Sequence, residues 1–372
     1  MDSESDDLYD KNPELVQRLS ERGATLVILN LPIGSEFGVD MKQWEIGERF
    51  RGVKMIPVGV HFIYFSNALN GSVAPRTGFF HNFIERETVV YEWNPRDEML
   101  EEIRDPEQVE RFVADRRNLD RHLGPYPYET YRHWLSLTEK LTAAVVQRVQ
   151  PEDGYIYSVQ QLIPQKYPPE KPAAGAEDQG LPDMKEEPKS ALRLTPIPIR
   201  RHPEGATAAQ ITQYGMDGSY VLRVMLDSVG TENLLGKIDY RLLRELQFAF
   251  IVFLCGQRFE GFECWKKLVR VICSAGAAMA ASQLETFYLN FISILHFQLK
   301  EVPKDFFLDI VSRENFLTDT LSTFFRNVQD SAPEGGALRR RAERFQSHLT
   351  RYFKWDFDQE AEEDLPQIVE VE

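Results

Sequence analysis

The sequence predicts an α+β protein in which a β-rich N-terminal domain with flanking helices precedes an all-α domain. Residues 24–93 hold short runs of β-branched and aromatic residues separated by glycine and proline, which is typical of an antiparallel sandwich or barrel-like sheet. Residues 205–355 instead repeat apolar side chains at spacings of three and four, the period of amphipathic helices. The length of 372 residues suits two domains.

The N-terminal domain is expected at residues 12–155, after an acidic, disordered terminus at residues 1–11. Its first helix covers Pro13–Arg22 and stops at Gly23, a residue type favoured just past a helix end. Strands and two more helices follow, punctuated by glycine and proline. The expected strands are residues 24–31, 53–66, 77–84 and 88–93, and the expected helices are residues 105–123 and 129–150, hinged at residues 124–128.

A linker is predicted at residues 156–204. Nine of the 21 prolines and a single aromatic residue, Tyr167, lie within residues 164–203. Such a composition cannot bury enough apolar surface to offset the entropy of ordering the chain. We therefore interpret this stretch as a linker or a long flexible loop.

The helical domain is expected at residues 205–355. Its central helix is nearly apolar all round, as expected of a helix buried by its neighbours. Pro303 is expected to start one of the later helices and Asn315 to cap the next. The expected helices include residues 242–254, 262–272, 287–299 and 337–354.

The last of these helices combines an apolar seam with a basic surface. Six basic residues stand against one acid, Glu343, so that the helix carries a net charge of +5. Three explanations are open: contact with RNA phosphates, docking of the acidic tail that follows, or a plain solvated face. The seam is Leu338, Ala342, Phe345, Leu349 and Tyr352, and the basic residues are Arg339, Arg340, Arg341, Arg344, Arg351 and Lys354.

The tail, residues 356–372, carries eight acidic side chains and no basic one, yet it closes on three β-branched residues within four positions. This pattern is typical of a segment that is disordered alone and adds a strand to a partner's sheet edge when docked. A solvated acidic terminus is the alternative. Two aromatic residues at the start of the tail are expected to anchor it on the helical domain. The candidate partner-binding residues are Trp355, Phe357, Leu365, Ile368, Val369 and Val371.

Composition argues against several classes of protein. The net charge is −15, but the two acidic termini account for most of it, and the body shows no basic excess of the kind that nucleic-acid-binding domains have. The N-terminus lacks the apolar stretch of a secretory signal, and no apolar run is long enough to span a membrane. Cys255, Cys264 and Cys273 are nine residues apart, which suits neither a metal knuckle nor a disulfide. We expect a soluble protein in a reducing compartment.

Catalytic chemistry is not indicated. The chain has no phosphate-binding loop, dinucleotide fingerprint, zinc-protease motif or nucleophile elbow. His61 and His81 lie on adjacent expected strands, but no carboxylate stands near them at ligand spacing. A metal-dependent enzyme built on this pair is therefore a minor alternative to ordinary packed or surface histidines. We predict no catalytic residue, cofactor or metal.

Seven strings in this order resemble the Aar-two splicing-factor family over the chain from about residue 12 to its end. They are LVILNLPIGSEFGVD (26–40), FRGVKMIPVGVHF (50–62), GPYPY (124–128), PEGATAAQIT (203–212), LQFAFIVFLCG (246–256), FFLDIVSRENFLTDTL (306–321) and FKWDF (353–357). The resemblance implies a VHS-like helical domain and a non-catalytic assembly chaperone of the U5 small nuclear ribonucleoprotein, cytoplasmic and nuclear, monomeric outside its complex and without membrane contact. The linker and the extreme termini depart from the resemblance.

The same resemblance implies a partner, the large spliceosomal scaffold called pre-mRNA-processing-splicing factor eight. Its RNase H-like and MPN (Jab-one) domains would be bound, and a helicase would be kept off until maturation. The family's tail strand corresponds to residues 365–372 here. The alternative function is direct RNA binding through the basic helix; otherwise contact with nucleic acid is expected to be indirect or weak. The resemblance also suggests release by phosphorylation, for which Ser190 and Thr195 are candidate exposed hydroxyls near Arg200 and Arg201.

Overall fold

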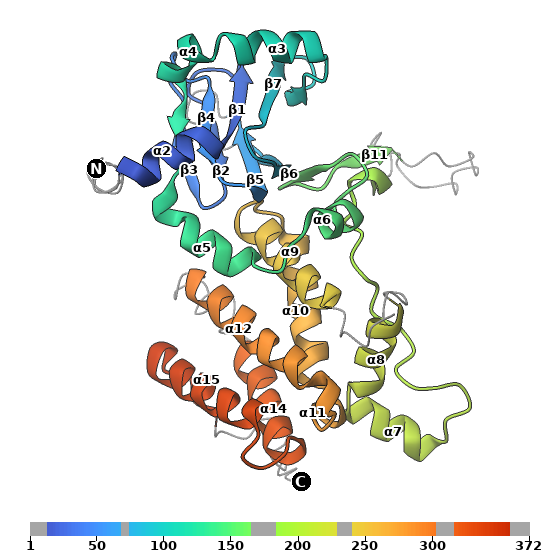
Figure 1. Ribbon diagram of the computed structural model, residues 1–372. Coiled ribbons are helices and arrows are strands. Elements are labelled where there is room, and N and C mark those ends of the chain that lie inside the picture. Colours follow the sequence, from blue (N-terminus) through green and yellow to red (C-terminus); the bar gives the residue numbers. More distant parts are fainter. Residues whose placement is uncertain (1–12, 68–73, 165–183, 229–239, 303–315, 358–372) are drawn as a thin grey trace, which may run out of the picture. The chain divides into compact units, whose positions relative to one another are not determined.

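The computed structural model describes residues 13–67, 74–164, 184–228, 240–302 and 316–357 (Figure 1). The chain divides into two compact units. The N-terminal unit runs to Leu194 and also takes in Ile251–Glu260, and the helical unit comprises Thr195–Phe250 and the residues from Gly261 onward. Strands gather in the first unit and helices make up the second, which confirms the α+β class.

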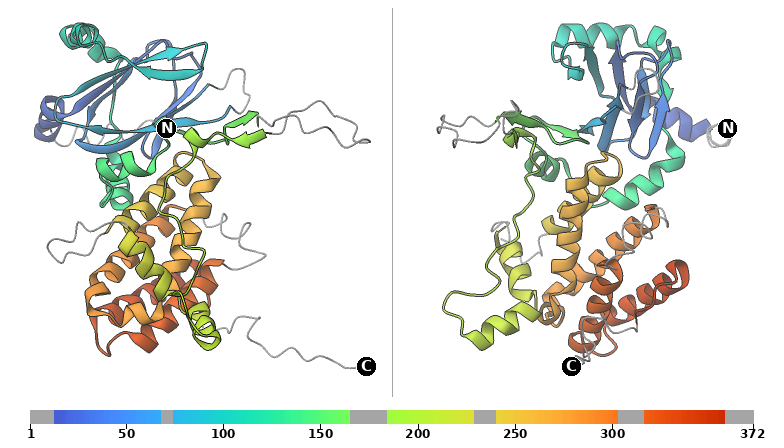
Figure 2. Two further views of the ribbon diagram at one scale, coloured as in Figure 1. Left: turned by 90° about the vertical axis from the view of Figure 1, so that its right-hand side faces the viewer. Right: turned by 180° about the vertical axis from the view of Figure 1, so that it is seen from behind.

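Two five-stranded sheets of the N-terminal unit enclose one apolar core (Figure 2). The first sheet has the order β8-β7-β1-β4-β9 and the second the order β10-β6-β5-β2-β3. Side chains of both sheets, such as Ile28, Phe37, Phe79 and Trp93, share this core. The strands are β1 (Ala24–Leu29), β2 (Glu36–Val39), β3 (Lys42–Glu45), β4 (Gly52–Ile56), β5 (Gly59–Ser66), β6 (Thr77–Phe83), β7 (Thr88–Asn94), β8 (Met99–Glu102), β9 (Gly124–Pro125) and β10 (Tyr155–Tyr157).

Strand direction differs from the prediction in the first sheet. The second sheet is antiparallel throughout, but β1 pairs with β7 and β4 with β9 in parallel, so the first sheet is mixed. The chain crosses to the other sheet between these strands, and alternation of apolar residues carries no information about direction. The single run expected at residues 53–66 is two strands, because the chain leaves β4 at Pro57 and enters β5 at Gly59, whose φ of +130° favours glycine.

Helices of the N-terminal unit follow the predicted segments, with more breaks. The first has the predicted bounds, and Gly23 donates its N–H to the Leu19 carbonyl at 2.8 Å. A side chain at Gly23 would clash with the backbone of Met55, so the position requires glycine. The helices are α2 (Pro13–Arg22), α3 (Pro106–Ala114), α4 (Arg116–Leu119), α5 (Tyr128–Thr138) and α6 (Ala143–Val149).

The described part of the predicted linker makes specific contacts, so a free linker over residues 156–204 is wrong for these residues. β10 extends the second sheet beside β6, and β11 (Leu162–Pro164) pairs with β12 (Met184–Glu186). Arg193 donates to the carbonyl oxygens of Gln150 at 2.6 Å and Gln147 at 2.8 Å. Proline-rich chain is extended, and extended chain can add edge strands without forming a core of its own. Residues 165–183 lie outside the described residues.

Helices of the second unit match the predicted segments closely. α14 and α15 pack against each other, and α15 also packs beside α12 (Figure 1). Pro303 and Asn315 lie outside the described residues. Among the residues that the structure describes, no helix has the length and apolar composition needed to cross a membrane. The helices are α7 (Ala208–Met216), α8 (Ser219–Ser228), α9 (Arg241–Leu254), α10 (Phe259–Cys273), α11 (Gly276–Met279), α12 (Glu285–Glu301), α14 (Phe316–Ser331) and α15 (Ala337–Phe353).

Candidate protein-binding site at the C-terminal helix

α15 is held by the apolar seam that its sequence predicts, with one exception. Leu338, Ala342, Phe345 and Leu349 are buried. The fifth expected member, Tyr352, is 41% exposed and stacks on His348 with ring centroids 5.7 Å apart, so its assignment to the seam is wrong. A helix drifts relative to its neighbours over several turns, and the last turn extends past the core.

The chain turns back where α15 ends. Lys354 adopts the left-handed conformation, with a φ of 63°, and terminates the helix. The Trp355 ring stacks on Phe353 at 4.7 Å, and the Phe357 ring meets Phe325 of α14 at 5.1 Å. Phe325 in turn contacts Phe345, eight residues before the end of the helix. The chain therefore leaves the helical unit already directed back along α14 and α15.

Of the six candidate partner-binding residues, the structure describes two. Trp355 and Phe357 are half-buried and lie in the aromatic contacts of the exit, as expected of an anchor. Their contact with a partner stays a prediction. Leu365, Ile368, Val369 and Val371 lie outside the described residues.

The basic residues of α15 fall into two groups. Arg339 donates to the carbonyl oxygens of Gln329 and Ala332 and so satisfies the end of α14, and Arg340 donates to the Gly335 carbonyl. The other four are exposed and form no ion pair within the described part of the chain. A hollow of about 270 Å³ lies on this side of α15. We call these four residues the basic face: Arg341, Arg344, Arg351 and Lys354.

Two histidines next to the basic face have lowered pKa values, first because they are buried and second because cations lie near them. The rings of His296, on α12, and His348, on α15, lie 4.7 Å apart. Burial lowers the pKa of His296 to about 4, and the charges of Lys300, His348 and Arg341 contribute in the same direction. Burial, Lys300 and Arg351 also lower the pKa of His348. Both pKa values lie below the ordinary value of a histidine, so neither ring adds a positive charge at pH 7.

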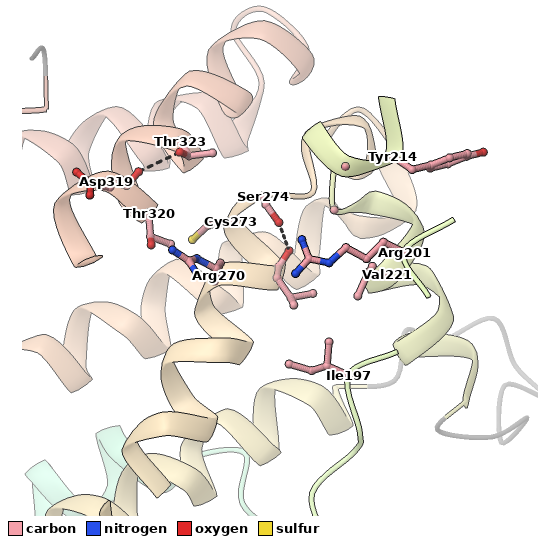
Figure 3. A pocket seen from close by; sticks show the side chains of 13 residues that line it. Ile197, Arg201, Tyr214, Val221, Arg270, Cys273, Ser274, Asp319, Thr320 and Thr323 are labelled. Carbon is pink, nitrogen blue, oxygen red and sulfur yellow. Dashed lines mark hydrogen bonds between the residues drawn. The ribbon is translucent and has the colours of Figure 1, made fainter. Parts of the chain in front are cut away.

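A second hollow, of about 260 Å³, lies elsewhere in the helical unit and was not expected from the sequence (Figure 3). Arg201 reaches it from the segment before α7, Arg270 from α10 and Asp319 from α14. Burial raises the pKa of the Cys273 thiol in its wall well above the ordinary value, so this thiol is unsuited to nucleophilic chemistry. The lining residues come from segments far apart in the sequence, and no local motif could have indicated them.

His61 is the centre of a buried polar network that includes Asp40. The expectation that no carboxylate stands near it is therefore wrong. Its Nδ1 lies 2.6 Å from Asp40 Oδ2, and its Nε2 lies 2.9 Å from the Pro57 carbonyl oxygen. The Tyr126 hydroxyl donates to the same carboxylate at 2.5 Å. A carbonyl and a carboxylate both accept, so the ring is fully satisfied when it donates from both nitrogens. At 1% exposure it is closed to a substrate, and the network supports the fold.

His81 pairs with His61 across β5 and β6, but its own partner is Glu87, at 3.3 Å. Each histidine thus has its own carboxylate, and the two do not converge on one site. Among the described residues, no group of three or more histidine, cysteine or acidic side chains is arranged to hold a metal ion.

The two candidate phosphorylation sites are not exposed hydroxyls, and that expectation is wrong. Ser190 is 1% exposed, and its hydroxyl donates to the Glu187 carbonyl at 2.9 Å. The Thr195 hydroxyl donates to the buried carboxylate of Glu245 at 2.6 Å, and its N–H donates to the same group at 2.8 Å. A proline-rich composition indicates extended chain, but extended chain that packs on a folded unit has buried side chains.

Family models match most of the chain. One described as the AAR2 N-terminal domain matches residues 22–151, and one described as the AAR2 C-terminal repeat region matches residues 194–358. The second match begins one residue before the helical unit does, at Thr195. The residues between the two matches fall on the proline-rich stretch.

Curated relatives align with nearly the whole chain. A protein named Protein AAR2 homolog from Macaca fascicularis is 41% identical over 379 residues, with 97% of both chains covered, and the human protein of that name matches to the same extent. The Caenorhabditis elegans protein of that name is 39% identical over 370 residues, which cover 93% of this chain and 98% of the relative.

Proposed function

The chain belongs to the AAR2 family, and from that premise we propose that it is a non-catalytic assembly factor in the biogenesis of the U5 small nuclear ribonucleoprotein. It binds the large scaffold protein, pre-mRNA-processing-splicing factor eight, through the RNase H-like and MPN (Jab-one) domains. While bound, it occupies a surface that the helicase needs. Two observations support this proposal: the motif strings resemble the family, and the site at the C-terminal helix has chemistry that suits binding.

The observation that carries the proposal is the anchored exit of the tail. Phe357 packs on Phe325, so the acidic tail leaves from a fixed point of the folded unit. A tail that starts at a fixed point has a high effective concentration near a surface bound by the same unit. The tail then adds a strand to a sheet edge of the scaffold through residues 365–372.

The expected free energies indicate that the tail strengthens an interface that other surfaces of the chain form. Each main-chain hydrogen bond of the added strand contributes on the order of 1 kcal/mol net. Ile368 contributes about 1.5–3 kcal/mol if it fills an apolar pocket of the partner. Ordering opposes this at roughly 1–2 kcal/mol per residue. We therefore expect loss of the tail strand to weaken binding and not to abolish it.

The test is the affinity of the purified chain for a scaffold fragment that holds both partner domains, measured by calorimetry. Removal of residues 365–372 and the substitution Val369→Pro should each weaken binding severalfold or more, because proline removes a donor from the strand. Ala361→Pro, placed before the predicted strand, is the matched control and should bind like the unaltered chain. Equal affinities for all four chains would reject strand addition.

Direct RNA binding is the second candidate, and the basic face favours it, since its four cations have no partner in the described part of the chain. Binding to phosphates weakens steeply with salt because counterions are released. Titration of a single-stranded RNA at several salt concentrations decides between the candidates. Affinity that falls steeply with salt and is lost on neutralising the basic face would support the RNA function.

A further inference from the structure

We propose that the second hollow of the helical unit binds a small organic anion. Arg201 and Arg270 hold its carboxylate or phosphate group, and apolar side chains of the wall hold its body. The hollow lies wholly within the helical unit and shares no lining residue with the hollow at α15. The proposal goes beyond the proposed function and does not rest on it.

Hydrogen bonds between elements fix the wall of the second hollow. The Gly218 N–H donates to the Ser274 carbonyl at 2.9 Å, which ties the turn between α7 and α8 to the end of α10. The side chain of Asn327, on α14, donates to the Cys273 carbonyl at 2.9 Å. Because three parts of the wall are bonded to one another, little has to be ordered when a ligand binds, and this favours affinity.

Two arginines supply positive charge to the wall. Arg201 lies in the segment before α7 and Arg270 in the last turn of α10 (Figure 3). Both are exposed, and within the described residues neither guanidinium forms a hydrogen bond or an ion pair. The Arg270 guanidinium lies 5.7 Å from the centroid of the Phe316 ring, which restricts its orientation. Asp319 is the acid of the wall, so two cations and one acid leave a net charge of +1, which suits a single anionic group.

One buried hydroxyl in the wall has no hydrogen-bond partner among the described residues. It belongs to Thr320, which is 8% exposed. The hydroxyls of Ser274 and Thr323, in the same wall, donate instead to backbone carbonyls. Buried polar groups usually have a partner, and an oxygen of a bound ligand would supply one here. Guanidinium groups bind the oxygens of a carboxylate or phosphate through paired N–H donors, so the same ligand group suits the arginines.

The rest of the ligand is apolar and small. Ile197, Val221 and Val271 give the wall an apolar part. The volume of about 260 Å³ lies just below the range of about 300–1,000 Å³ that is usual for sites of drug-sized ligands. A single ring or a short chain that carries one anionic group is therefore the expected size. An inorganic anion would leave the apolar part of the wall in water, and a neutral apolar molecule would leave the guanidinium groups without an anion.

The test is a titration of the full-length chain with phenyl phosphate, followed through the NMR shifts of the Gly215, Gly218 and Ser274 amides. Benzoate is the carboxylate probe, and inorganic phosphate and phenol test the anionic group and the ring separately. We expect saturable shifts with phenyl phosphate or benzoate. Inorganic phosphate and phenol should bind at least about tenfold more weakly, because each makes only part of the contacts. The tighter of the first two probes identifies the anionic group.

Substitution of the arginines tests where the anion binds. Arg201→Gln combined with Arg270→Gln should weaken binding of the tighter probe by at least about tenfold, since glutamine carries no charge. The matched control is Arg223→Gln combined with Arg326→Gln. It removes two exposed arginines of the same unit that lie outside the wall, and it should bind like the unaltered chain.

A second variant keeps the test valid if the double variant fails to fold. Gly215 lines the hollow, and a Cβ added there meets no atom within 4 Å. Gly215→Leu therefore adds a side chain where the hollow has space and should weaken binding by a similar factor. Gly47→Leu, in equally open surroundings in the N-terminal unit, is the control.

Two results would overturn the proposal. One is the absence of saturable shifts at the three amides with both phenyl phosphate and benzoate. The other is equal affinity of the unaltered chain and the folded wall variants, which would place the binding elsewhere on the surface. No scaffold protein enters this test, so it can fail while the proposed function stands, and the reverse.

Discussion

Histidines and charged side chains have opposite environments in the two units. In the N-terminal unit, His61 is closed to solvent and bonded at both nitrogens, to Asp40 and to the Pro57 carbonyl. In the helical unit, His296 and His348 lie beside cations, and the four residues of the basic face have no ion-pair partner in the described part of the chain. A buried polar group with every bond satisfied supports a fold. Four exposed cations that outnumber the one acid beside them, Glu343, suit a ligand from outside the folded unit.

The largest effect on stability is expected from a substitution that breaks the buried network. Asp40→Ala removes the carboxylate that accepts from His61, Tyr126 and the Phe62 N–H. Each buried donor left without its acceptor costs about 1–3 kcal/mol, and we expect the free energy of unfolding in urea to fall by about 3–5 kcal/mol. Glu87→Gln is the control, because Glu87 is partly exposed and its pair with His81 is long. A fall below about 1 kcal/mol for Asp40→Ala, the range of exposed pairs, would show that the network is not structural.

A smaller effect is expected at Thr195. Thr195→Val removes the hydroxyl that donates to the buried Glu245 carboxylate and keeps the shape of the side chain. Leaving a buried acceptor short of a donor costs about 1–3 kcal/mol, so the midpoint of thermal unfolding should fall. Thr195→Ser keeps the donor and should unfold close to the unaltered chain. If valine has no effect on unfolding, Thr195 is free enough to be reconsidered as a site of modification.

The histidine pair predicts a dependence of stability on pH. The pKa of His296 is lowered to about 4, so the folded state takes up this proton less readily than the unfolded chain, whose histidines titrate near 6.5. The stabilising contribution is therefore complete above about pH 6.5 and is lost as the pH falls toward 4.

We expect His296→Gln with His348→Gln to flatten the fall of the unfolding midpoint between pH 6.5 and 4.5, since neither glutamine titrates. His133→Gln, an exposed change in the other unit, should leave the slope unaltered. An unchanged slope in the double variant would mean that burial and the nearby cations do not lower the pKa values of the two rings.

The smallest effect concerns the basic face itself. Neutralising Arg341, Arg344 and Arg351 with glutamine should change the free energy of unfolding by less than about 0.5 kcal/mol, as is usual for surface positions. Arg339→Gln should cost more, because Arg339 satisfies carbonyl oxygens at the end of α14. If the three neutral substitutions destabilise the chain strongly, the basic face has a role in folding and the contrast between the units fails.

Features set by short stretches of chain could be predicted before the structure. Gly23 ends the first helix at the expected residue, and α9 and α15 lie within one residue of their predicted bounds. Helix periodicity and helix ends depend on residues three or four positions apart, so a single segment carries the signal. The mixed direction of the first sheet could not be predicted, because it depends on which strands meet after the chain has crossed between sheets.

By itself, the sequence determined the α+β class, the order of the two folded regions, most helices and the family, since local periods and motif strings specify these. It also predicted an acidic tail next to a basic helix. Only the tertiary structure decided which polar groups are satisfied. Asp40 meets His61 from 21 positions away and Tyr126 from 86 positions away. Glu245 meets Thr195 from 50 positions away, and His296 on α12 meets His348 on α15. The burial or exposure of a polar side chain depends on contacts distant in the sequence, and no local pattern encodes them.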